Sequence, residues 1–123
     1  MNNYELVIFD WDGTLMDSVA RIVSCMQSAA KVVELTIPST DSVKNIIGLS
    51  LPKAVATLFP SCNEQQAVEV IAQYKHHYVA VDKTPTPLFN DAVHLLSQLR
   101  ENNKLLAVAT GKAREGLERV WQL

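Results

Sequence analysis

Two carboxylates lie two residues apart near the start of the chain, directly after an apolar segment at residues 4–9. In extended backbone, Asp10 and Asp12 point to the same side, so a cation or a shared proton must offset their repulsion. Oxygen ligands of this kind suit Mg²⁺. Asp10 is a candidate nucleophile on phosphorus, and Asp12 a candidate acid and base for the leaving oxygen and the attacking water. Gly13 allows a turn in which amides approach a phosphate, and Thr14 begins the next segment.

A second polar cluster, Thr110-Gly111-Lys112, follows another apolar segment at residues 104–109. Thr110 offers a hydroxyl and Gly111 an amide, and both are candidates to bind phosphate where a helix N-terminus favours anions. Lys112 is a candidate substrate contact, with a solvated lysine at a helix start as the alternative interpretation.

Hydrophobic periodicity predicts the elements that must position these clusters. The apolar segments at 4–9 and 104–109 are typical of buried strands. Between them, apolar side chains at three- and four-residue spacing predict amphipathic helices. The expected helices cover residues 16–35, 40–48, 51–59, 63–78 and 90–99, with a proline-containing linker at 82–89 and a further helical pattern at 117–121.

The order strand, helical block, helix, strand predicts a parallel α/β sheet. In such sheets ligands bind beyond the carboxyl ends of the strands, where both polar clusters fall. Either cluster alone is also typical of an ordinary turn. Their joint occurrence at two strand ends favours a shared site. Asp17 or Ser18 is the expected N-cap of the first helix, and Asn90 or Asp91 is the expected N-cap of the helix at 90–99.

Composition excludes several other classes. The 123 residues include 13 acidic and 11 basic side chains, so nothing favours nucleic acid or an anionic membrane as a partner. No apolar run is long enough to cross a bilayer, and the first residues do not resemble a signal peptide. We therefore expect a cytoplasmic chain in which Cys25 and Cys62 are two buried thiols.

The motifs carry a resemblance to a known family. FDWDGTLMDS resembles the first motif of the haloacid dehalogenase superfamily, and VATGK resembles its second. IIGLSLPKAV and LFNDAVHLLSQL are similar to segments of the phosphoglycolate-phosphatase-like branch, although Asn90 stands where a proline is common. The resemblance implies a partial Rossmann-like parallel sheet core at 1–14 and 84–123, with an inserted α-helical cap at 15–83.

The resemblance also implies roles for individual residues. Asp10 matches the nucleophile that becomes an aspartyl-phosphate and ligates Mg²⁺. Asp12 matches the acid/base residue, whose carbonyl is a further metal ligand, and it favours phosphoryl transfer over dehalogenation. Thr110 matches the hydroxyl that binds phosphate. The implied activity is a Mg²⁺-dependent phosphatase acting on a small phosphorylated metabolite, with a phosphoglycolate-like compound as the first candidate.

Two later motifs of the family, a lysine and an acidic pair, cannot be placed in the sequence. We therefore expect this chain to be weakly active or inactive by itself. The alternative is a truncated, non-catalytic remnant that associates through its open sheet edge, as a homodimer or with a complementary fragment. A receiver domain also uses an acidic pair, a threonine and a lysine, but the long helical block fits it badly.

Overall fold

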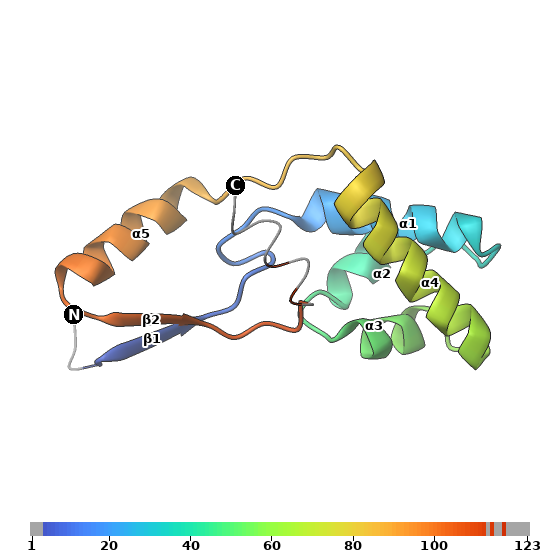
Figure 1. Ribbon diagram of the computed structural model, residues 1–123, viewed down its shortest axis with the longest axis horizontal. Coiled ribbons are helices and arrows are strands. Elements are labelled where there is room, and N and C mark those ends of the chain that lie inside the picture. Colours follow the sequence, from blue (N-terminus) through green and yellow to red (C-terminus); the bar gives the residue numbers. More distant parts are fainter. Residues whose placement is uncertain (1–3, 113, 115–116, 118–123) are drawn as a thin grey trace.

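The computed structural model describes residues 4–112 together with Arg114 and Leu117 (Figure 1). Its elements follow the predicted order. They are β1 (Leu6–Phe9), α1 (Val19–Val32), α2 (Thr40–Asn45), α3 (Leu51–Leu58), α4 (Glu64–His76), the π-helical turn η1 (His77–Val81), α5 (Asn90–Glu101) and β2 (Leu105–Val108). The helical pattern expected at 117–121 lies almost wholly outside the described residues.

The two strands form a parallel pair, which confirms the predicted α/β class. Leu6 pairs with Leu105 and Phe9 with Val108, so both strands end at the same edge. Helix α5 runs along one face of the pair, as Figure 1 shows. On that side Phe9, Val108 and Leu96 pack against a buried cluster that contains Trp11 and Met16.

The other face of the sheet is exposed. Leu6, Ile8 and Leu105 are 48%, 59% and 68% exposed, although they belong to an apolar strand pair. The expectation of two buried strands is therefore wrong for this face. Parallel strands are buried when helices cover both sides of the sheet, and in the described part of the chain α5 covers one side.

The helices α1 to α4 form a separate block beyond the carboxyl end of the sheet (Figure 1). Their shared core includes the fully buried side chains of Met26, Val43, Val55 and Val70. The second predicted helix ends at Asn45, before a turn in which Gly48 adopts φ +101°. No helix in the described part of the chain combines the length and the apolar character that a bilayer crossing requires.

The chain enters and leaves the helical block through two adjacent segments. The Asp17 amide donates to the Pro87 carbonyl over 2.7 Å, and the Phe89 amide donates to the Leu15 carbonyl over 2.9 Å. This pairing holds residues 15–17 in extended backbone, so α1 begins at Val19 and not at Met16 as the periodicity predicts.

Buried Arg21 and partly buried Asp82 fasten the exit segment to α1. The Arg21 guanidinium donates to the carbonyl of Tyr78 and, over 2.8 Å, to that of Thr84. The Ser24 hydroxyl donates to Asp82 over 2.6 Å, and the Thr84 amide donates to the same carboxylate over 2.8 Å. Burial raises the pKa of Asp82, but these hydrogen bonds and Arg21 outweigh it and lower the pKa from 3.8 to about 2.

The two cysteines differ in their surroundings. Cys25 is fully buried in α1, and burial, with Asp82 nearby, raises the pKa of its thiol to about 12. Cys62 is partly exposed, so the expectation of two buried thiols is wrong for Cys62. It lies in the turn between α3 and α4 and packs against the core of the block without being enclosed by it.

The Asp82 contacts predict a pH-dependent contribution to stability. We expect Asp82→Asn to lower the free energy of unfolding by about 1 kcal/mol at neutral pH, because the charged acceptor is lost. Since the folded pKa is depressed, the deficit should be full above about pH 4 and should shrink as pH falls through about 2. Urea denaturation across this range measures it. Glu101→Gln, an exposed change of equal charge, serves as the control, and a deficit that does not vary with pH would contradict the assignment.

Candidate active site

A cavity of about 80 Å³ lies where the carboxyl ends of the strands meet the helical block. Five of the seven predicted site residues line it, namely Asp10, Asp12, Thr110, Gly111 and Lys112. The remaining lining residues come from the helical block and the turns between its helices. They are Ile22, Met26, Ile46, Ile47, Gly48, Leu49, Leu51, Ala54, Tyr74, Lys75, Tyr78 and Val79.

Asp10 is the first residue after β1 and is exposed at the cavity. Its Oδ1 accepts a hydrogen bond of 2.7 Å from the Trp11 amide. Trp11 itself is buried against α5 and its neighbours. The buried indole thus fixes the backbone next to the carboxylate, while the carboxylate stays accessible.

Asp12 is held more tightly. Its Oδ1 accepts a hydrogen bond of 2.7 Å from the Ser18 hydroxyl and lies 3.3 Å from the Lys112 Nζ. The Asp12 side chain is 12% exposed, and Ser18 is fully buried. Ser18 occupies the N-cap position of α1 as predicted, but its side chain makes no cap hydrogen bond because it serves Asp12. Ser18 is therefore a positioning residue for Asp12.

Lys112 joins the two halves of the site. Its Nζ donates to the Tyr78 hydroxyl over 2.9 Å and lies 4.1 Å from the centre of the Tyr78 ring. The Lys112 side chain is 8% exposed, so the interpretation as a solvated lysine is wrong. A cation that contacts both a carboxylate and a tyrosine ring ties the strand end to the helical block.

The Thr110-Gly111 turn lies against the loop between α2 and α3. The Thr110 hydroxyl accepts a hydrogen bond of 3.0 Å from the Lys112 amide. A Cβ at Gly111 would lie 2.8 Å from the Gly48 carbonyl oxygen and 3.0 Å from the Leu49 carbonyl. This close approach explains why a glycine follows Thr110.

Gly13 and Thr14 are not brought into the cavity. Gly13 has φ +74°, which fits the predicted turn, and its amide donates to the Met16 carbonyl over 2.9 Å. The Thr14 amide donates to the Trp11 carbonyl over 3.2 Å. Both amides are thus used inside the turn that shapes the Asp12 backbone.

Sequence reasoning missed the part played by Tyr74 and Tyr78. The helical spacing placed both in the core of the block, which is where they lie, but their rings also line the cavity. Burial, with Tyr78 next to it, raises the pKa of Tyr74 well above its ordinary value, so the phenol stays neutral. Their spacing of four residues on one helix face was the available signal, since it shows that the two rings are neighbours.

The donor set at the strand end suits a hard cation. Mg²⁺ in proteins is held through one or two carboxylates together with waters and phosphate oxygens. The accessible Asp10 carboxylate and the Asp12 main-chain carbonyl are oxygen donors of that kind. Among the described residues no group of three or more His, Cys, Asp or Glu side chains could hold a metal ion, so water and phosphate would complete the shell.

A parallel α/β core, an inserted helical block and an acidic pair at the strand end define a class of capped hydrolase-type folds. The comparison with protein families agrees. A family model for haloacid dehalogenase-like hydrolases matches residues 7–122. The chain belongs to that family.

The relatives of this chain carry different names. Tyrosine-protein kinase PtkA of Mycobacterium tuberculosis is 36% identical over 116 residues, covering 94% of this chain and 39% of the relative. Probable phosphatase IndB of Dickeya dadantii is 30% identical, covering 87% and 48%. Phosphoglycolate phosphatase of Vibrio cholerae is 26% identical, covering 91% and 53%. The chain thus spans about half the length, or less, of these relatives.

Solved structures show the same fold. The structure of PtkA from Mycobacterium tuberculosis superposes with a TM-score of 0.81 at 34% identity, covering 97% of this chain and 54% of that one. A haloacid dehalogenase-like hydrolase from Bacteroides fragilis reaches a TM-score of 0.87 at 24% identity, covering 98% and 57%. The likeness to the second structure concerns the fold alone.

Gly111 lies so close to the Gly48 and Leu49 carbonyls that a methyl group at this position should push the strand end and the facing loop apart. We expect Gly111→Ala to lower the free energy of unfolding by about 1–3 kcal/mol, because backbone atoms on the facing loop cannot move aside like a side chain. Chemical denaturation measures the change. Ala109→Gly, two residues earlier in the chain, is the control for altered backbone freedom. An unchanged stability in Gly111→Ala would show that the facing loop yields freely.

Proposed function

We propose that this chain carries the nucleophile and the cap of a Mg²⁺-dependent phosphatase for small phosphate monoesters. The observation that supports it is the meeting of Asp10, Asp12, Thr110 and Lys112 in one cavity, although about a hundred residues separate the two clusters. Family membership and the phosphatase names of two relatives support the same reaction class. The cytoplasm remains the proposed compartment.

The proposed reaction has two steps. An Asp10 oxygen attacks phosphorus, the bond to the ester oxygen breaks, and Asp12 gives that oxygen its proton. Water then attacks the aspartyl-phosphate, Asp12 takes the proton from water, and inorganic phosphate leaves with Asp10 restored. The Ser18 hydroxyl keeps Asp12 in place throughout.

Positive and polar groups around the phosphoryl oxygens determine the rate of such a transfer. The Thr110 hydroxyl and the Lys112 ammonium are the groups of this chain placed to contact those oxygens. When bound, Mg²⁺ would offset the repulsion between the Asp10 carboxylate and the phosphate dianion. The Lys112 Nζ lies 3.3 Å from Asp12 Oδ1. Lys112 must therefore exchange this carboxylate for phosphoryl oxygens, and Asp12 must gain a proton, before the transfer begins, so we expect slow turnover from the described residues alone.

The aspartyl-phosphate can be tested directly. We expect incubation with p-nitrophenyl phosphate and Mg²⁺ to add one phosphoryl group to the Asp10 peptide, detected by mass spectrometry and removed by hydroxylamine. Asp10→Asn should give no adduct, since an amide is a poor nucleophile. Asp12→Asn should slow hydrolysis of the adduct by about 10²- to 10⁴-fold through loss of the general base, so the adduct should accumulate.

Asp17→Asn is the matched control, because Asp17 belongs to the same segment but does not line the cavity. It should form the adduct at the rate of the unaltered chain. An adduct that persists in Asp10→Asn, or one located on another residue, would exclude the proposed nucleophile.

A second candidate function is association between copies of this chain. The exposed apolar sheet face of Leu6, Ile8 and Leu105 favours it, because contiguous exposed apolar surface favours contact with a partner. A second copy would supply an identical apolar face. This interaction could accompany the phosphatase activity or replace it.

The association predicts a change in solution mass. We expect the chain to behave as a dimer in size-exclusion chromatography with light scattering, and Ile8→Thr with Leu105→Thr to behave as a monomer, since threonine keeps the strand propensity but removes apolar surface. Val68→Thr, which alters an exposed valine on α4, should remain dimeric. A monomeric unaltered chain would contradict this candidate.

A further inference from the structure

The cavity has a polar part and an apolar part that come from different regions of the chain. The strand ends contribute the polar groups, Asp10, Asp12, Thr110 and Lys112. The helical block contributes mostly hydrocarbon and aromatic surface. Met26, Ile47, Leu49, Tyr74 and Tyr78 belong to this apolar surface. A phosphoryl group bound at the strand ends would therefore direct its alcohol portion towards the apolar part.

Two aromatic rings form part of this apolar wall. The Tyr74 and Tyr78 rings lie 5.8 Å apart, centre to centre, at an interplanar angle of 36°. Tyr78 is 3% exposed, and its hydroxyl contacts Lys112, so its ring is held in position. Arg21 and Lys112 lie 4.9 Å and 4.1 Å from the centre of the Tyr78 ring, so this ring supports its neighbour. The partly buried Tyr74 ring and the aliphatic side chains present the surface against which a flat apolar group can be buried.

If the alcohol portion of the substrate carried a negative charge, few cations in this cavity could replace its lost hydration. Among the described lining residues the cations are Lys75 and Lys112. Lys112 already contacts Asp12 and Tyr78, and Lys75 is exposed on α4. A carboxylate placed against the apolar wall would lose its hydration without gaining a buried partner.

We infer that the cap selects phosphate monoesters of small apolar or aromatic alcohols over those that carry a carboxylate, such as phosphoglycolate. The inference rests on the proposed function, since it assumes that the phosphoryl group binds at the strand ends. The cavity of about 80 Å³ includes the strand ends and must hold the phosphoryl group as well, so the alcohol is limited to a small group. The selecting side chains belong to α1, the turn after α2, α3, α4 and η1, and not to the catalytic strand ends.

Two phosphonates that cannot be hydrolysed separate the substrate classes. Benzylphosphonate corresponds to phenyl phosphate, and phosphonopropionate corresponds to phosphoglycolate. With Mg²⁺ present, we expect isothermal titration calorimetry to give a Kd for benzylphosphonate at least about tenfold lower, because the phosphonopropionate carboxylate must be desolvated. Inorganic phosphate should compete with both, and Thr110→Val should weaken both.

A charge introduced into the wall tests which residues select. Ile47 lines the cavity and is partly buried, so Ile47→Lys places a cation where it is less hydrated than the exposed Lys75. We expect it to shift the preference towards phosphonopropionate by about tenfold or more. Val68→Lys makes the same change on α4 outside the cavity and should leave the preference unaltered.

The outcomes separate the inference from the function on which it rests. Equal binding of the two phosphonates, or tighter phosphonopropionate binding that Lys75→Gln removes, would overturn the substrate class while leaving the phosphate site intact. Benzylphosphonate binding that neither phosphate nor Thr110→Val affects would overturn the proposed function. If the folded protein, checked by circular dichroism, binds neither phosphonate nor phosphate, both proposals fail.

Discussion

The constraint on which this structure depends is that a helical block is inserted between the first strand and the helix that leads to its neighbour. The chain must leave the sheet after β1, form the helical block and return beside the end of β1 before α5 begins. Hydrogen bonds between residues 15–17 and 87–89 join the segments by which the chain leaves and returns. The pairing of Phe9 with Val108 keeps the two strand ends together, and these hydrogen bonds hold the helical block beside them. Without that closure the block would have no fixed place over the two polar clusters.

Much of this arrangement follows from sequence patterns because it rests on periodicity and on strand ends. The apolar periods identify every helix from α1 to α5, and the parallel order identifies the edge at which the polar clusters meet. What the patterns missed depends on tertiary contacts. Met16 has helical spacing but lies in the extended segment paired with residues 87–89. Ser18 resembles a helix cap but donates to Asp12.

The candidate site likewise combines residues that local motifs identify with contacts between residues far apart in the sequence. Asp10, Asp12, Thr110, Gly111 and Lys112 were found because residue type and position at a strand end suffice to single them out. The Lys112 contact with Tyr78 could not be found this way, since 34 residues separate the two and no local pattern relates them. Likewise, the exposure of Ile8 depends on how many helices cover the sheet, which the strand's own sequence does not specify.

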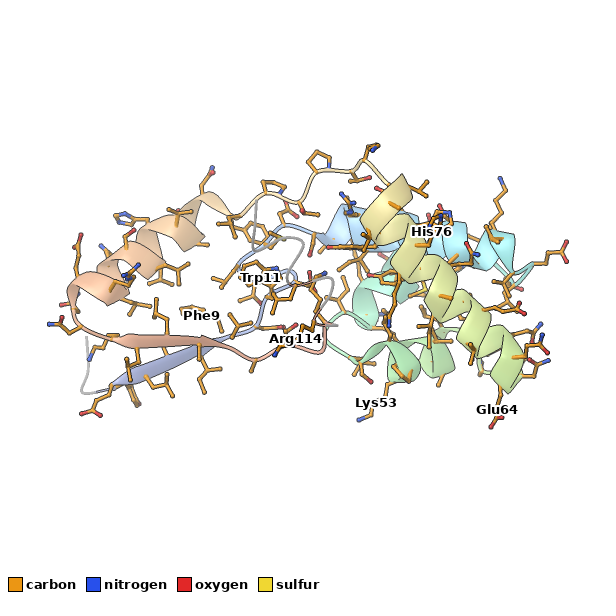
Figure 2. The ribbon with its side chains drawn as sticks, viewed as in Figure 1. Phe9, Trp11, Lys53, Glu64, His76 and Arg114 are labelled. Atoms are coloured by element: carbon orange, nitrogen blue, oxygen red, sulfur yellow. The ribbon has the colours of Figure 1, made fainter. Side chains whose placement is uncertain are left out.

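Arg21 has a consequence for how the cavity can be reached. This one side chain, buried in the first turn of α1, donates to the carbonyls of Tyr78 and Thr84 and so ties together both ends of the inserted block. The tied segment follows α4, whose last residue, His76, is labelled in Figure 2. Any opening that preserves these bonds must turn about Arg21 as a pivot. The Gly48 loop approaches Gly111 through main-chain carbonyls, so such a movement would separate backbone surfaces at that contact.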